Sequence, residues 1–390
     1  MRGAGIAGAF RRVPAGEALP VNIPGRPRWV VISALGICQI FAWGGSYYLL
    51  AVLALPIGKA TGWSTIWILG GLSVGLLVSG LVSPTVGRAI DRRGGRPVLA
   101  VSAVLLSAGL AVIAIAPHPF VYVGGWIIIG LGMGAGLYDP AFSALGRLYG
   151  DEARSAITHL TLFGGFASTV CWPLSAFLVE RLGWRGASLS YAGIDLAIVL
   201  PLYLLGLPRE RTRPPALRRR EAAAGATSAN RPDRRAFLLL AAGLTVASVI
   251  MTIISVDILT LLQTRGLTLA AAVGLGALIG PAQVGARVVE AAFGRRHHPI
   301  WSLLASTLLV VAGLALLLGP ASLIGAGLVL YGSGSGIRSI ARGTVPLAMF
   351  GKDGYAILMG WLAMPILVAQ AASPAIGSLL VGGLARRSRS

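Results

Sequence analysis

Long apolar stretches separated by short polar segments dominate this chain. Eleven of them are each about as long as the ~20 apolar residues that cross a bilayer as a helix. Their apolar positions are continuous rather than alternating, which excludes an outer-membrane barrel. The pattern therefore predicts an all-α polytopic membrane protein. The eleven stretches cover approximately 29–55, 65–86, 97–116, 121–145, 156–179, 187–207, 236–262, 269–293, 300–318, 321–349 and 356–384.

A basic segment divides these stretches into two groups. Residues 208–235 hold nine arginines among proline, alanine and serine. Such a composition cannot bury a core, so we expect a cytoplasmic linker between a helical half at 29–207 and a second half at 236–390. Residues 1–28 hold five arginines and no apolar core of signal-peptide length, and we expect them to form a cytoplasmic N-terminal extension.

Charge distribution predicts the orientation. The chain is 55% hydrophobic and 12% charged, against roughly 25% charged residues in a soluble domain. Its net charge of +20 is concentrated in short segments between the apolar stretches. With a cytoplasmic N-terminus, 23 arginines and lysines lie in inside segments and four in outside loops, as the positive-inside rule requires. This distribution favours a multi-pass inner-membrane protein over a nucleic-acid-binding protein.

A compact basic turn between the second and third stretches carries the strongest motif. Gly87, Asp91, Arg92 and Arg96 belong to the spacing Gly-x-x-x-Asp-Arg-x-Gly-x-Arg. This spacing resembles the signature loop of the major facilitator superfamily. The resemblance implies two six-helix halves that work by alternating access. Because only eleven stretches are counted, we expect the twelfth helix to be missing, most simply by truncation.

Two shorter motifs and one arginine narrow the resemblance. Residues 62–64 (Gly-Trp-Ser) open the second stretch in the manner of the monocarboxylate and oxalate/formate porters, and 183–185 (Gly-Trp-Arg) form a turn common in facilitator proteins. Arg287 lies well inside the eighth stretch, at a depth where the monocarboxylate porters have an arginine for the substrate carboxylate. In this chain Gln283 replaces the acidic partner of that arginine. Arg287 could therefore anchor a substrate carboxylate, or could instead be a gate residue paired with Glu290.

The resemblance gives the carboxylate of the basic turn a mechanical role. It places Asp91 near Gly354 and Tyr355, where the N-terminal dipole of the eleventh helix would favour a negative charge. With Arg92 and Arg96, Asp91 would then form a conformational latch that closes the cytoplasmic side. The alternative is a solvated turn residue.

Other ionisable residues within apolar stretches are functional candidates because their burial is costly. Arg338 and Arg342 could line an anion path or could extend to the cytoplasmic interface. Asp139 could couple transport to protons or could accept an arginine from a neighbouring helix. Asp195 and Asp257 are further proton-coupling candidates.

The first stretch adds polar and aromatic groups. Gln39, Tyr47 and Tyr48 could form part of the wall of a substrate cavity, although packing is the commoner role of such residues. Catalytic sets, metal-ligand spacings and phosphate-binding loops are not evident. We therefore expect a monomeric non-enzymatic transporter that has no cofactor or metal.

These observations predict a secondary transporter for a small organic anion such as a monocarboxylate, with protons as a candidate co-substrate. A drug or metalloid exporter is an alternative, for which Cys38 and Cys171 would supply thiols. A truncated, non-transporting paralogue is another.

Overall fold

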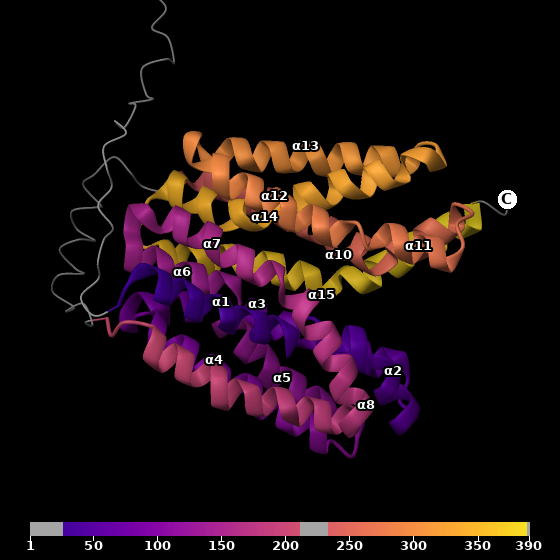
Figure 1. The fold of residues 1–390 in the computed structure, drawn as a ribbon, viewed down its shortest axis with the longest axis horizontal. Coiled ribbons are helices and arrows are strands. Elements are labelled where there is room, and N and C mark those ends of the chain that lie inside the picture. The colour runs from indigo at the N-terminus through magenta and orange to yellow at the C-terminus, as the bar shows by residue number, and fades with distance from the viewer. Residues whose placement is uncertain (1–25, 211–232, 388–390) are drawn as a thin grey trace, which may run out of the picture.

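The computed structural model describes residues 26–210 and 233–387, except for the side chains of 374–387 and of residues 255–257, 259, 260, 264, 269, 270, 273 and 295. The expectations for 1–25, 211–232 and 388–390 lie outside the described residues. Within the described chain the regular structure is entirely helical, as predicted (Figure 1). The first half contains α1 (Arg28–Gly44), α2 (Leu49–Thr61), α3 (Thr65–Arg93), α4 (Gly95–Ile115), α5 (Pro119–Gly136), α6 (Tyr138–Tyr149), α7 (Ala153–Gly165) and α8 (Ala167–Ile194).

Two π-helical segments, η3 (Asp195–Val199) and η4 (Leu202–Gly206), complete the first half. Single 3₁₀ turns, η2 (Gly150–Glu152), η5 (Gly294–Arg296) and η6 (Ala321–Leu323), connect other elements. The second half contains α10 (Arg234–Thr264), α11 (Leu269–Gly276), α12 (Ile279–Phe293), α13 (Pro299–Leu318), α14 (Ile324–Phe350) and α15 (Tyr355–Arg387).

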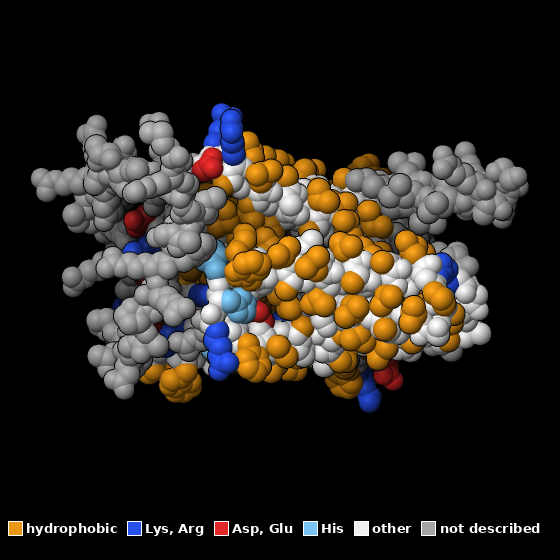
Figure 2. Space-filling model, turned by 90° about the horizontal axis from the view of Figure 1, so that it is seen from above, with side chains coloured by type: hydrophobic (Ala, Val, Ile, Leu, Met, Phe, Trp, Pro, Cys, Tyr) orange, Lys and Arg blue, Asp and Glu red, His pale blue; other side chains and the backbone are white. Residues whose placement is uncertain are grey.

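Seven helical stretches of the described chain are long and apolar enough to cross a membrane. One of them, Pro119–Gly206, has 88 residues and is far longer than the ~20 residues of a single crossing. Hydrophobic side chains cover most of the face seen in Figure 2, and basic side chains lie at its margins. This distribution is that of a bundle surrounded by lipid.

The turn at Gly183 reverses the chain within this long stretch. Gly183 adopts φ 67°, a left-handed conformation that glycine tolerates without steric penalty. Arg185, just after it, donates to the Ala116 carbonyl at one end of α4, whereas Glu210 accepts from the Gly95 amide at the other end. Residues 184–206 therefore run back along α4. The predicted Gly-Trp-Arg turn lies at this reversal.

Several predicted helices are interrupted near their middle. The first stretch breaks between α1 and α2, the fourth at Leu137, the fifth at Phe166 and the eighth between α11 and α12. Continuous apolar patterns gave no sign of these breaks. Non-helical backbone at membrane depth is tolerated where it is buried in protein or lines a cavity, which makes the breaks candidate binding positions.

The basic turn after the second stretch is shorter than predicted. Helix α3 continues to Arg93, so Asp91 and Arg92 lie on its last turns, and the chain reverses at Gly94 with φ 85°. Arg92 and Arg93 are favourable there because a helix C-terminus attracts cations. We call the end of the bundle that carries Gly94, Glu210, Asp233 and Gly351 the linker end.

Helices α3 and α15 pack closely across the boundary between the halves. A Cβ on Gly87 would collide with the Ala356 carbonyl, and one on Gly80 would lie 3.1 Å from the Met364 carbonyl. Glycine lets the two backbones approach, as is common where small residues line membrane helix interfaces. The predicted proximity of the Gly87 region to the start of the eleventh helix is thus present in the fold.

Replacing Gly87 by valine is expected to force α3 away from α15 and to lower the thermal unfolding midpoint of the purified protein. Overpacking of this kind costs about 1–3 kcal/mol. Gly70→Ala is the matched control, because a Cβ on Gly70 of the same helix meets nothing within 4 Å. Equal midpoints for the two variants would contradict the close packing described here.

Candidate functional site

A cavity of about 260 Å³ lies between the halves, where three of the helix breaks meet. The first half contributes Tyr48 from the α1–α2 break and residues 164–166, 168 and 169 from the α7–α8 break. The second half contributes Gly280, Pro281, Gln283, Val284 and Arg287, all from α12, which follows the α11–α12 break. Because a water molecule occupies ~30 Å³ of liquid, the volume corresponds to roughly nine waters or one small solute.

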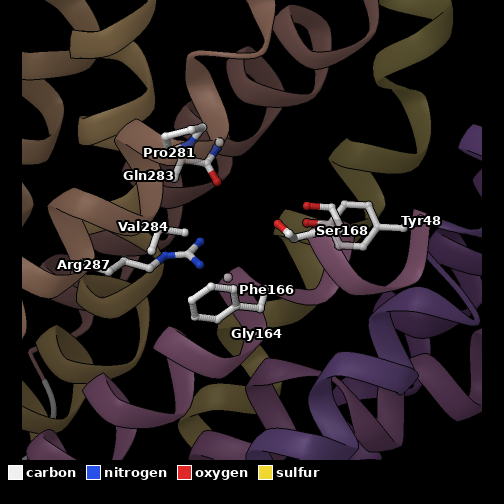
Figure 3. A pocket seen from close by; sticks show the side chains of 11 residues that line it. Tyr48, Gly164, Phe166, Ser168, Pro281, Gln283, Val284 and Arg287 are labelled. Carbon is white, nitrogen blue, oxygen red and sulfur yellow. The ribbon is translucent and has the colours of Figure 1, made fainter. Parts of the chain in front are cut away.

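Arg287 is the cationic group of this cavity. Its guanidinium and the side chains of Ser168 and Tyr48 point toward one another across the space (Figure 3). The side chain is only 7% exposed, Nη1 donates to the Thr161 carbonyl at 3.2 Å, and Nε has no hydrogen-bond partner. The alternative of a pair with Glu290 is not observed within the described chain, where Glu290 accepts from the Ser302 hydroxyl at 2.6 Å and lies beside His297.

The three candidates of the first stretch take different positions. Tyr48 lines the cavity. Tyr47 packs edge-on against Trp43 and interacts with the Thr252 side chain of α10. Gln39 is fully buried, donates from Nε2 to the Gly136 carbonyl at 2.7 Å and accepts from the Trp43 indole at 3.2 Å.

Gln39 does not line the cavity, and both ends of its amide are engaged by protein groups, so its substrate-binding role stays a prediction. Gly136 is the last residue of α5, so its carbonyl lacks an intrahelical partner. The Gln39 amide satisfies it and holds α1 against the break between α5 and α6.

Asp139 meets Arg342 in an ion pair that joins the halves. Arg342 Nε lies 2.9 Å from Asp139 Oδ1, and Nη2 lies 2.6 Å from Oδ2. This fork-to-carboxylate geometry is the strongest form of side-chain hydrogen bonding. Tyr138, adjacent to Asp139, packs against the cavity residue Gly164. The pair therefore lies immediately beside the cavity, and the predicted alternative of an arginine partner for Asp139 is the one observed.

Arg338 lies one helical turn before Arg342 on α14 and is only 7% exposed. Its Nη2 has no hydrogen-bond partner. Extension of Arg338 and Arg342 to the cytoplasmic interface, the predicted alternative for both, is wrong because both side chains remain inside the bundle. Arg338 is not among the residues that line the cavity.

The basic turn after α3 is held within its own half. Arg147 of α6 forms an ion pair with Glu210 and donates to the Asp91 backbone carbonyl. Arg96 donates to the Leu204 carbonyl at 2.5 Å, and Arg92 is exposed. Within the described chain the half-buried Asp91 carboxylate has no hydrogen-bond partner. Its contact with the start of α15 stays a prediction, whereas Arg147 and Glu210 were missed because sequence spacing does not connect them.

Two further contacts join the halves at the linker end. Lys352 Nζ lies 2.9 Å from Asp151 Oδ2 at the surface. Arg154 donates to the His297 carbonyl at 2.7 Å and to the Gly294 carbonyl, both beside the C-terminus of α12. Together with the Asp139–Arg342 pair, these contacts join the halves at the linker end.

The remaining candidates with described side chains do not line the cavity. Asp195 is buried inside the first half, and the side chain of Asp257 lies outside the described residues. Cys38 and Cys171 are buried, with sulfurs directed at the carbonyls of Val199 and Ile40. Neither thiol lines the cavity, so the geometry gives no support to a metalloid site.

Comparison with protein families settles the class. The family model of the Major Facilitator Superfamily matches residues 35–374, most of the chain. The chain belongs to this superfamily. The glycine and arginine spacing after α3 was therefore a correct indicator. A facilitator fold accounts for two helical halves that meet around one central cavity.

Among curated proteins, the facilitator chain is 34% identical over 203 residues to Monocarboxylate transporter 11 of Mus musculus, covering 48% of this chain and 43% of that protein. It is 33% identical over 154 residues to an uncharacterized 38 kDa protein of Thermoproteus tenax, covering 40% of each chain. The alignments thus span less than half the length of these relatives. Relatives named as transporters point to transport rather than enzymatic turnover.

Solved facilitator structures share the fold at low sequence identity. The human organic anion transporter MFSD10 superposes with a TM-score of 0.69 at 19% identity, covering 90% of this chain and 93% of that one. The transporter FucP in its outward conformation gives a TM-score of 0.65 at 15% identity, covering 90% and 97%. These likenesses show that the chain shares the facilitator fold.

Proposed function

We propose that this facilitator protein is a monomeric secondary transporter of small carboxylates, with monocarboxylates as the preferred class. The observation that carries the proposal is the Arg287 guanidinium, which is buried at the cavity with Nε unsatisfied. A buried charge without a counter-ion is costly, and a carboxylate is the natural partner of the planar guanidinium fork. The similarity to a protein named a monocarboxylate transporter supports this class.

The balance of charge around the cavity also favours an anion. Arg287, Arg338 and Arg342 lie inside the bundle near the boundary between the halves, and Asp139 is committed to Arg342. Arg287 and Arg338 form no ion pair within the described chain. An anionic solute would supply the missing negative charge, whereas a cation would be repelled.

The contacts between the halves support alternating access. We assign the linker end to the cytoplasm, because its basic segments match the positive-inside rule. The Asp139–Arg342 and Asp151–Lys352 pairs would then hold the cytoplasmic side closed while Arg287 receives the solute. Asp91 would form the predicted latch on α15, next to the close contact of Gly87 with that helix. In this proposal the protein resides in the inner membrane with a cytoplasmic N-terminus.

Counterflow in vesicles tests the proposal. Purified protein in liposomes loaded with unlabelled lactate is expected to take up labelled lactate faster than protein-free liposomes. External pyruvate should compete, whereas lactamide should not, because it replaces the carboxylate by a neutral amide and leaves Arg287 unpaired. Uptake equal to that of protein-free liposomes, or equal competition by lactamide, would reject a carboxylate substrate. Oxalate in a parallel assay distinguishes dicarboxylate transport.

A further inference from the structure

The most isolated acidic group of the described chain lies inside the first half, away from the cavity. Asp195 is 2% exposed, and its Oδ2 atom has no hydrogen-bond partner. It occupies the first position of η3, midway along the segment that runs from Gly183 to Gly206. Asp139, by contrast, has a guanidinium on both carboxylate oxygens.

Neutral groups surround this carboxylate. Segment η3 packs against α1, α4, α8 and η4. The titratable groups that face Asp195 are Cys38 of α1, Cys171 and Tyr191 of α8, and Tyr203 of η4. Helix α4 contributes serines at this level, and its one titratable residue, Arg96, lies in its first turn and donates to the Leu204 carbonyl. No described arginine, lysine or histidine acts on the carboxylate.

An ionised carboxylate in this position would be expensive. A charged group within a bilayer-spanning bundle is stable only with a partner or with access to water. The described surroundings of Asp195 offer neither, because the titratable side chains that face it are thiols and phenols. A proton on Asp195 removes the charge and converts an oxygen that can only accept hydrogen bonds into a donor.

We propose that Asp195 is the proton-binding residue of this transporter and that it carries its proton while the linker end is closed. The inference rests on the proposed carboxylate transport, which it extends by naming the coupling ion and its site. One proton bound as a neutral carboxylic acid would accompany one monocarboxylate anion, so the transport cycle would move no net charge. When the surroundings of Asp195 open to water, the carboxylic acid would release this proton and become an ionised carboxylate.

The helical geometry offers a means of changing those surroundings. Asp195 begins one π-helical segment and Tyr203 lies in a second, and π-helical turns are frequent at functional sites. Cys38 of α1 contacts η3 through the Val199 carbonyl. The next residue of α1, Gln39, holds the Gly136 carbonyl at the break that precedes Asp139. A movement of α6 on breaking the Asp139–Arg342 pair would therefore be transmitted through α1 to the contacts of Asp195.

The decisive variant is Asp195→Asn, which keeps the size of the side chain and removes its titration. In lactate-loaded vesicles the variant should retain exchange of labelled for unlabelled lactate, because exchange needs no net proton movement. Accumulation of lactate driven by an imposed pH gradient should be lost. Glu180→Gln, an exposed carboxylate on α8, is the matched control and should accumulate lactate like the wild type. Asp195→Glu should restore part of the accumulation.

Gradient-driven accumulation by Asp195→Asn equal to that of the wild type would overturn the inference while leaving carboxylate transport intact. If the wild type shows no lactate flux, the proposed function fails, and infrared spectroscopy decides the proton site separately. The wild-type protein should show the carbonyl stretch of a buried protonated carboxylic acid, shifted in Asp195→Glu and missing from Asp195→Asn. Absence of that band from the wild type would overturn the inference, including when the asparagine variant does not fold.

Discussion

Arg287→Ala should lower lactate counterflow by at least about tenfold at low substrate concentration. Hydrogen bonds to a charged group contribute roughly 1.5–3 kcal/mol, and each 1.4 kcal/mol corresponds to a factor of about ten in binding. The loss should be large because Arg287 is the only charged side chain that lines the cavity in the described chain. Removing it leaves the carboxylate of the substrate without a cationic partner in the cavity.

Two further variants separate charge from geometry. Arg287→Lys keeps a positive charge but loses the planar fork that can meet both carboxylate oxygens, so we expect a partial defect. Arg181→Ala removes an arginine that packs over the Phe177 ring away from the cavity and should leave counterflow unchanged. Counterflow by Arg287→Ala at the wild-type rate would exclude Arg287 as the anchor.

The fold could be predicted from the sequence because its main determinant, a long apolar stretch for each helix, recurs along the chain. A bilayer requires about 20 apolar residues per crossing, so each helix leaves a signal that does not depend on its neighbours. The spacing of residues from Gly87 to Arg96 identified the protein family. The close approach of Gly87 to Ala356 shows why glycine is needed there. Most helix breaks were not accessible, because Leu137, Phe166 and residues 277–278 are as apolar as the helices around them.

The candidate site could be predicted only in part, because some of its contacts join residues that are far apart in the sequence. Arg287 was identified because a charged residue within an apolar stretch is costly, and Tyr48 because an aromatic residue with a polar tip suits a cavity wall. Asp139 and Arg342 are 203 positions apart, so only the packing of the two halves brings them together. Gln39 is a polar residue of the kind found in binding sites. In the structure, however, both ends of its amide form hydrogen bonds within the protein, to the Gly136 carbonyl and from the Trp43 indole.

Breaking the Asp139–Arg342 pair should open the linker end. Asp139→Asn leaves the Arg342 guanidinium buried without its counter-charge, and removal of one partner of a buried ion pair typically costs about 3–5 kcal/mol. The cost falls on the closed state, in which the pair forms across the boundary between the halves. Thiol labelling can measure the opening, using Thr158→Cys in a background with Cys38 and Cys171 replaced by serine. Thr158 is buried in a small hollow between the halves at the linker end.

Labelling of that cysteine should be at least about tenfold faster with Asp139→Asn, which corresponds to 1.4 kcal/mol or more against the closed state. Lys352→Ala is the matched control, because it removes an ion pair that also joins the halves but lies at the surface. Exposed pairs contribute only about 0–1 kcal/mol, so its labelling should change little. Exchanging the charges, with Asp139→Arg and Arg342→Asp together, should restore slow labelling. If Asp139→Asn and Lys352→Ala label at the same rate, the buried pair does not control closure, and the exposed contacts and the packing of α3 on α15 must supply it.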